Sequence, residues 1–181
     1  GLGLRIGRSD TIDKAAVGLG SAVAAAGIVW VAYLFAWRLS GSAVGARRTA
    51  LALALGTLVW PYSKFGFNVA LTSGCLTAGI YSAWVGVRLD RVKTLAASSA
   101  WLAWAFLTRH EMAVPALLVA AWIIFESRHT WRRLTERLIW FSIPLAAAFA
   151  FWLWYNDVRF GSPLDPGNLD DPVVGFDAPI L

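Results

Sequence analysis

The chain has 181 residues, of which 58% are hydrophobic and 15% are charged. A soluble domain is typically about 45–50% apolar and about 25% charged, so this composition favours an integral membrane protein. The net charge is +5, but the basic residues lie in short links between apolar runs. That is the positive-inside pattern of membrane proteins, so we expect no nucleic-acid partner.

The sequence lacks the residues for a metal site with several ligands. Cys75 is the only cysteine, and His110 and His129 are the only histidines. A site built from several imidazole or thiolate groups cannot be assembled from this set. We therefore expect no metal and no cofactor, and no disulfide can form within the chain.

The N-terminal half predicts a short interfacial segment followed by three helices. Residues 1–14 mix charges with glycine and predict a loop or interfacial segment. The apolar run Ala15–Trp37 is long enough to span a bilayer. The run Thr49–Trp60 is shorter and ends at Pro61, where we expect a break because the residue before a proline avoids the α region. The run Phe65–Val87 is again full length.

Small residues recur every four positions in two of these runs. They are Gly18, Ala22 and Ala26 in the first run, and Gly74, Ala78 and Ser82 in the third. This spacing lets helices approach closely in a membrane, so we expect both faces to pack against other helices.

The C-terminal half predicts three more helices, over Leu95–Leu107, Ala113–Phe125 and Leu138–Tyr155. From Asn156 onward the chain is acidic and rich in proline and glycine, which is typical of turns. The sequence therefore predicts an all-α, polytopic transmembrane bundle of about six spanning helices. It divides into a membrane domain, residues 1–155, and an extracytoplasmic loop or tail, residues 156–181.

Six spans place the connecting links alternately on two sides of the membrane. One side receives residues 38–48, 88–93 and 126–137, with ten Lys and Arg residues, and the other receives six together with eight of the eleven acids. The positive-inside rule puts the first side in the cytoplasm, so both termini are predicted to be extracytoplasmic.

The polar groups that could bind a ligand gather on the predicted outer side. Helices of about 15 residues rise only about 22 Å, against a hydrocarbon core of about 30 Å. The short runs therefore place two polar clusters in a depression below the outer surface, where charges are costly unless they pair or line a wet cavity. Because Lys and Arg bind phosphate well, we expect an anion site there. The candidates are Lys64, Arg109, His110 and Arg159, with Tyr62, Asn156 and Asp157 beside them.

Plainer interpretations stay open at this point. Arg109 and Glu111 can pair with each other in a loop, and Lys64 can extend to lipid headgroups. The arginines between Arg128 and Arg137 are read as a topology signal that also favours anionic headgroups.

Three stretches of the chain resemble a known family. They are "ALALGTLVWPYSK" (52–64), "AWAFLTRHEMAVPALLVAAW" (103–122) and "WYNDVRFGSPLDPG" (154–167). All three are similar to segments of polytopic GT-C glycosyltransferases of the protein mannosyltransferase and aminoarabinose transferase kind, and they occur in the family's order. The resemblance implies residence in the bacterial inner membrane, contact with the lipid bilayer and a polyprenyl-phosphate-linked sugar as donor.

The same resemblance implies a reaction. The sugar passes to an acceptor on the outer side with inversion, an aspartate of the first outer loop acts as general base, and basic groups stabilise the departing lipid phosphate. Lys64 and Arg109 match the phosphate-binding positions, and Arg159 matches less closely.

Two departures from the family pattern matter. Residue 1 is glycine and Met112 is the only methionine, so we expect that residues upstream, including the first outer loop, are missing. In addition, Asn68-Val69 stands where the family commonly has an acid followed by proline. The alternative to a part of a transferase is thus a non-catalytic accessory subunit of a larger membrane assembly. A transporter is a third and weaker possibility, since no inverted repeat is visible.

Overall fold

The computed structural model describes residues 6–62 and 67–164. Their elements are α1 (Ile6–Ser40), α2 (Ala43–Gly56), α3 (Val59–Tyr62), α4 (Phe67–Arg88), α5 (Val92–Thr108), the 3₁₀ helix η1 (His110–Met112), α6 (Ala113–Ser127) and α7 (Trp131–Phe160). Within these residues every regular element is a helix, so the all-α prediction is confirmed.

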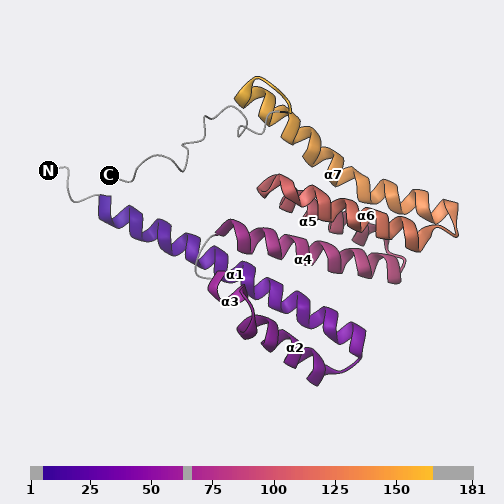
Figure 1. Cartoon of the computed structure of the whole chain (residues 1–181), viewed down its shortest axis with the longest axis horizontal. Coiled ribbons are helices and arrows are strands. Elements are labelled where there is room, and N and C mark those ends of the chain that lie inside the picture. The colour runs from indigo at the N-terminus through magenta and orange to yellow at the C-terminus, as the bar shows by residue number, and fades with distance from the viewer. Residues whose placement is uncertain (1–5, 63–66, 165–181) are drawn as a thin grey trace, which may run out of the picture.

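Apart from the short helices α3 and η1, each helix runs in the opposite direction to the one before it in the order α1, α2, α4, α5, α6, α7 (Figure 1). Helix α1 packs against α2 and α4, α4 also packs against α5, and α7 packs against α5 and α6. Consequently the links 41–42, 89–91 and 128–130 share one end of the bundle, which we call the basic end. Helix α3 and η1 share the other end, which we call the η1 end. The predicted alternation of links is therefore seen, while the side that faces the cytoplasm stays a prediction.

Four segments are long and apolar enough to cross a membrane, fewer than the six expected. They are Gly18–Ser40, Asn68–Arg88, His110–Ser127 and Trp131–Phe160. Helix α2 has 14 residues and α5 has 17. At about 1.5 Å per residue they rise only about 21 and 26 Å, less than the hydrocarbon thickness of about 30 Å. The described residues thus support an integral membrane protein with four candidate spans.

Two helices extend beyond their predicted limits. Helix α1 already begins at Ile6, so residues 6–14 are helical and not a loop. Helix α7 begins at Trp131 and ends at Phe160, five residues past the predicted domain boundary. Both predictions followed the apolar runs alone. At the start of α7 the polar residues include Arg132, Arg133 and Glu136, and arginine and glutamate favour the helix nearly as well as leucine. A change in polarity therefore does not mark the helix end.

The break in the second run lies before Pro61 and not at it. Thr57 is extended, with φ −127° and ψ −179°, directly after α2 ends at Gly56. Its hydroxyl donates to the carbonyl of Leu53 at 2.5 Å and accepts from the N–H of Val59 at 3.3 Å. Pro61 falls in the first turn of α3, where its missing N–H leaves no helical bond unmade.

Helix α4 is held close to both of its neighbours by glycines. A Cβ added at Gly74 would lie 3.6 Å from the carbonyl oxygen of Ala24 on α1, so this part of the predicted small-residue face is confirmed. Toward α5, a Cβ at Gly79 would lie 2.8 Å from Leu102, and one at Gly86 would lie 2.7 Å from Leu95. The closest approach on α4 therefore involves glycines that the four-residue spacing did not single out.

The predicted face of α1 is displaced by about one residue. Ala22 and Ala26 are exposed, whereas Ser21, Ala25 and Ile28 are buried. The buried residues are spaced four and three apart and include the large Ile28, so the four-residue repeat of small residues on α1 did not identify its packed face.

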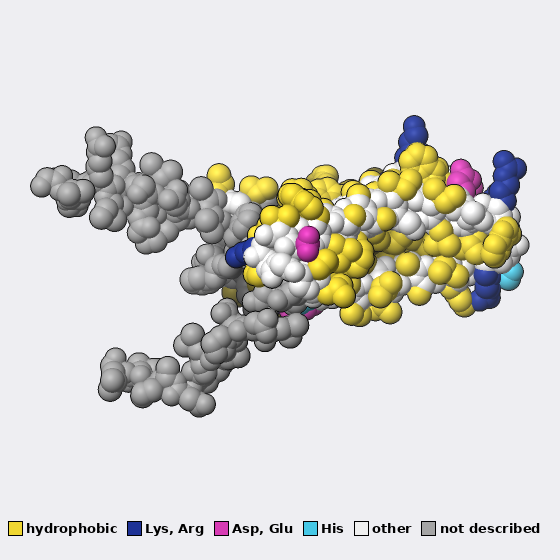
Figure 2. All heavy atoms as spheres, turned by 90° about the horizontal axis from the view of Figure 1, so that it is seen from above, with side chains coloured by type: hydrophobic (Ala, Val, Ile, Leu, Met, Phe, Trp, Pro, Cys, Tyr) yellow, Lys and Arg dark blue, Asp and Glu magenta, His cyan; other side chains and the backbone are white. Residues whose placement is uncertain are grey.

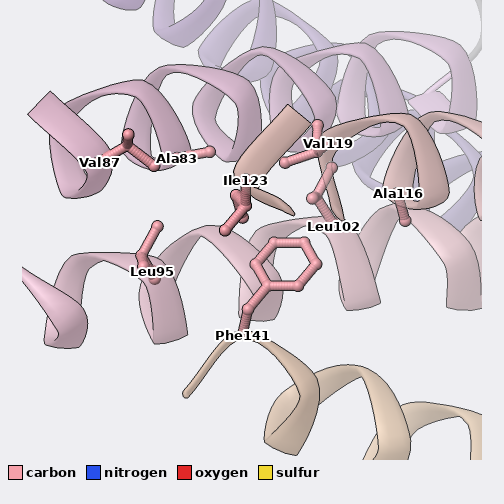
Figure 3. Packing of buried hydrophobic residues seen from close by; sticks show 8 residues of the cluster. All are labelled: Ala83, Val87, Leu95, Leu102, Ala116, Val119, Ile123 and Phe141. Carbon is pink, nitrogen blue, oxygen red and sulfur yellow. The ribbon is translucent and has the colours of Figure 1, made fainter. Parts of the chain in front are cut away.

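The core lies among α4, α5, α6 and α7. Figure 3 shows the ring of Phe141 directed from α7 toward Leu102 and Ile123. Phe141 is 2% exposed, and Leu102 and Ile123 are fully buried. Within a membrane the association of helices is driven by van der Waals packing, so this close-packed cluster fixes how α6 and α7 pack against α4 and α5.

The outside of the bundle is also apolar. Figure 2 shows apolar side chains along its length, while the Lys and Arg side chains visible on this face gather mainly at the end away from the grey residues. Val114, Leu117 and Leu118 of α6 are each more than 60% exposed. Such a continuous apolar surface is suited to contact with lipid.

Candidate functional site

The turn between α5 and α6 holds the central pair of the predicted site. Helix α5 ends at Thr108, and Arg109 follows in an extended conformation, with φ −150° and ψ 109°. The chain then turns through η1, where the N–H of Met112 donates to the carbonyl of Arg109 at 2.9 Å. His110 lies in η1 and is exposed. The turn therefore presents both side chains at the η1 end.

Arg109 already has an acidic partner. Its Nη2 lies 3.3 Å from Oε2 of Glu111, and the two side chains are 44% and 59% exposed. This is the local pair that the sequence left open as an alternative. An exposed pair of this kind contributes only about 0–1 kcal/mol, so a stronger anion could compete for Arg109.

Arg159 lies in the last turn of α7 and bonds within its own helix. Its Nη1 donates to the hydroxyl of Tyr155 at 2.8 Å, and its guanidinium lies 5.1 Å from the ring centroid of Phe160. Gly161 is the C-cap residue directly after α7, and its φ of 73° is left-handed. Asn156 is buried and donates to the carbonyl of Pro163 at 3.3 Å, so it orders the chain after the helix.

The structure brings two of the predicted arginines to the same end of the bundle. The rings of Phe106 and Trp152 lie 5.8 Å apart between α5 and α7. Arg109 is three residues after Phe106, and Arg159 is seven residues after Trp152, so both lie beyond this contact at the η1 end. Arg109 pairs with Glu111 two residues further along the chain, and Arg159 bonds to Tyr155 within α7.

Two predicted site residues cannot be placed fully. Lys64 lies outside the described residues. Tyr62 is the last residue of α3, and its side chain also lies outside what the structure describes. The proposed proximity of Lys64 to Arg109 therefore stays a prediction.

An apolar groove leads away from the Arg109 turn, and sequence reasoning missed it. It has a volume of about 450 Å³ and is bounded by α5, α6 and α7. Phe106 and Ala113 flank Arg109 on either side and line one part of the groove, while Leu138 and Phe141 line another. No sequence pattern predicts such a groove, because the positions that face lipid and those that line the groove are equally apolar.

A second groove, of about 660 Å³, lies between α1 and the α2–α3 segment. Ala22, Ala26 and Trp30 line it from α1, and Trp60 lines it from α3. Trp60 precedes Tyr62 by two residues, so this groove approaches the other cluster of the predicted site.

A polar cluster at the basic end was also missed. Arg137 is 7% exposed, and it donates to Ser127 Oγ at 2.8 Å, to the carbonyl of Val87 at 3.2 Å and to Asp90 Oδ1 at 2.7 Å. These bonds join α7 to α6, to the end of α4 and to the α4–α5 link. Sequence reasoning assigned Arg137 to a link, and its place within α7 is what turns it inward.

The charge of Arg137 acts on Asp90. The hydrogen bond from Arg137 lowers the pKa of Asp90 below its ordinary value, with the nearby charge of Arg133 acting in the same direction and desolvation opposing it. Asp90 has a φ of 51°, a left-handed conformation that aspartate adopts more readily than most residues. The link therefore has a geometric reason for an aspartate as well as an electrostatic one.

The described residues contain no group of three or more His, Cys, Asp or Glu side chains that could hold a metal ion. No known family model matches the chain, and no curated protein or solved structure shows significant similarity to it.

Proposed function

We propose that the chain is part of an integral membrane glycosyltransferase that moves a sugar from a polyprenyl-phosphate carrier to an acceptor on the outer side. The observation that carries the proposal is the apolar groove between α5, α6 and α7. Its lining includes Phe106 and Ala113, which stand three residues before and four residues after the exposed Arg109 in the chain. The order of the three family-like stretches supports the same assignment. The groove volume of about 450 Å³ lies within the usual range for ligand sites, about 300–1,000 Å³.

In this proposal the groove holds the isoprenoid chain and Arg109 holds the phosphate. The lining of Phe106, Ala113 and Leu117 offers an apolar surface to a hydrocarbon chain. A phosphate offers a bidentate acceptor to the guanidinium, whereas the exposed pair with Glu111 contributes only about 0–1 kcal/mol and so leaves Arg109 open to exchange. His110 in the same turn, together with Lys64, Tyr62 and Arg159, would complete the anion site.

The chemical role of these cations is to stabilise the leaving group. As the bond from the sugar to the phosphate breaks, negative charge grows on the phosphate oxygens. Positive side chains fixed beside those oxygens lower the energy of that transition state. The proposed orientation puts the η1 end outside the cytoplasm of a bacterial cell, in keeping with the distribution of basic links.

Binding of a polyprenyl phosphate to the purified protein in detergent tests this assignment. Arg109→Ala should weaken binding, whereas Glu111→Ala should strengthen it because the competing carboxylate is gone. Ala146→Trp should also weaken binding, since Ala146 lines the groove and is exposed. Arg132→Ala, an exposed arginine at the basic end, is the control for net charge. Equal affinity of Arg109→Ala and Arg132→Ala would refute the site.

The second candidate is an accessory subunit of a larger assembly. It is favoured by the groove of about 660 Å³ between α1 and α2, where Ala22, Ala26 and Ala54 would allow another helix to approach closely. Ala26→Trp should then release a partner chain during purification in mild detergent. A chain that purifies alone before and after this change would exclude the accessory role.

A further inference from the structure

We propose that the basic end of the bundle binds a phosphate group, at a site separate from the one at the η1 end. A polar cavity of about 210 Å³ lies there between α4, α6 and α7. Arg88, Arg133 and Arg137 line it, together with His129 and Thr130. Since a water molecule occupies about 30 Å³, this space can hold a phosphate with several waters.

The charge around the cavity favours an anion. Three arginines line it, and the carboxylates near them are Glu126, which also lines the cavity, and Asp90. Arg88 lies 3.8 Å from Glu126, and Arg133 lies 3.8 Å from Asp90. These are long ion pairs between partly exposed side chains, and they hold neither arginine firmly. Both guanidinium groups can therefore turn toward a phosphate while the surplus of positive charge attracts it.

The buried arginine also has capacity left. Arg137 is 7% exposed and lines the cavity. Its two terminal nitrogens bond to Ser127, Val87 and Asp90, but its Nε is buried and has no hydrogen-bond partner among the described residues. A buried donor without an acceptor is costly, and in native proteins it commonly marks the place of an ion or water.

The start of α7 adds donors on the same side. Thr130 is the N-cap residue of α7, and its side chain makes no capping hydrogen bond to the first turn. Thr130 lines the cavity, so the open N–H groups of a 30-residue helix begin beside it. Helix N-termini favour phosphate through these N–H groups and the helix dipole.

The position suits the phosphate of a lipid headgroup. Trp131, next to Thr130, is 80% exposed, and exposed tryptophans at helix ends are typical of the headgroup layer. The guanidinium of Arg128 lies 4.1 Å from the ring centroid of Phe125 at the end of α6. Basic pockets between membrane helices at this depth bind anionic headgroups. The inference does not depend on the proposed transferase, because it concerns the opposite end of the bundle.

Native mass spectrometry of the full chain in detergent tests this site. The protein is mixed with phosphatidylglycerol or with zwitterionic phosphatidylcholine, and the retained lipids are counted. We expect one phosphatidylglycerol per chain. Arg133→Gln should reduce its retention about fivefold or more, as loss of a charge-assisted phosphate contact would. Arg132→Gln removes the same charge from an exposed arginine that does not line the cavity, and it should retain the lipid.

Competition with inorganic phosphate identifies the source of the group. If millimolar phosphate does not displace the retained phosphatidylglycerol, the site is specific for the lipid. If it does displace the lipid, the site also takes free phosphate. Arg88→Gln is a second variant that should also reduce the retention of phosphatidylglycerol. Because the Arg88 side chain is exposed, such a loss would not be explained by misfolding. Phosphatidylcholine carries a phosphate too, but its choline cation would face the arginines of the cavity, so it should be retained less. Equal losses in Arg133→Gln and Arg132→Gln, or equal retention of the two lipids, would overturn the proposal.

Discussion

Replacing Gly79 with alanine should separate α4 from α5. The new Cβ would lie 2.8 Å from Cγ and Cδ2 of Leu102 and 3.3 Å from the carbonyl oxygen of Ser98. Carbon atoms in contact normally lie about 3.5–4.0 Å apart, so Leu102 would have to move by about 0.7–1.2 Å. Leu102 is fully buried, and overpacking of this kind costs about 1–3 kcal/mol. The Ser98 hydroxyl, which donates to the Gly79 carbonyl at 2.7 Å, would be displaced as well.

The free energy of unfolding in mixed micelles with increasing denaturing detergent, followed by tryptophan fluorescence, measures this loss. Gly27→Ala on α1 is the matched control, because a Cβ at Gly27 would meet no atom within 4 Å. It should leave stability unchanged or slightly raised. Leu102→Ala removes the colliding atoms, so Gly79→Ala should cost almost nothing in that background, a coupling that a double-mutant cycle detects. Equal stabilities of Gly79→Ala and Gly27→Ala would refute the close contact between α4 and α5.

Three further predictions concern the core and the basic end. Phe141→Ala should cost about 3–5 kcal/mol in the same unfolding assay, whereas Ile143→Ala, at a position 56% exposed, should cost less than about 1 kcal/mol; similar losses would contradict the core assignment. Arg137→Met should lower the free energy of unfolding by about 1–3 kcal/mol. Ser127→Ala should lower it less, because this change removes only one of the hydrogen bonds of Arg137. A free energy of unfolding that Arg137→Met leaves unchanged would exclude a stabilising role for Arg137. Because the pKa of Asp90 is lowered in the folded state by Arg137, its carboxylate stabilises the fold above its ordinary pKa of about 3.9 and loses this effect as pH falls through the folded value. Asp90→Asn should therefore be less stable than the wild type at neutral pH, with the gap closing below about pH 4, and a gap independent of pH would contradict the linkage.

Helix class and helix order could be predicted because apolar runs and charged links are coarse features. The six predicted runs each contain a helix in the structure, with Ala113–Ser127 starting at the predicted residue. Helix ends were predicted less well, since Trp131 begins α7 seven residues before the apolar run does. The cause is physical: a helix persists through polar residues that favour it, and membrane burial ends first.

The site was predictable only in part. The pairing of Arg109 with Glu111 follows from their separation by two residues across a tight turn, and it was considered from sequence. The groove beside Phe106 and the inward position of Arg137 depend on contacts between helices far apart in the chain. No local pattern encodes which face of an entirely apolar helix meets which neighbour.

The network of Arg137 also joins two helical hairpins. Helices α4 and α5 are connected by the three residues 89–91, and α6 and α7 by residues 128–130, so each pair forms a hairpin. Asp90 and the carbonyl of Val87 belong to the first hairpin, whereas Ser127 and Arg137 belong to the second. The buried guanidinium of Arg137 is therefore a link between the two hairpins, and a chain that ends before residue 137 would lack all three of these hydrogen bonds.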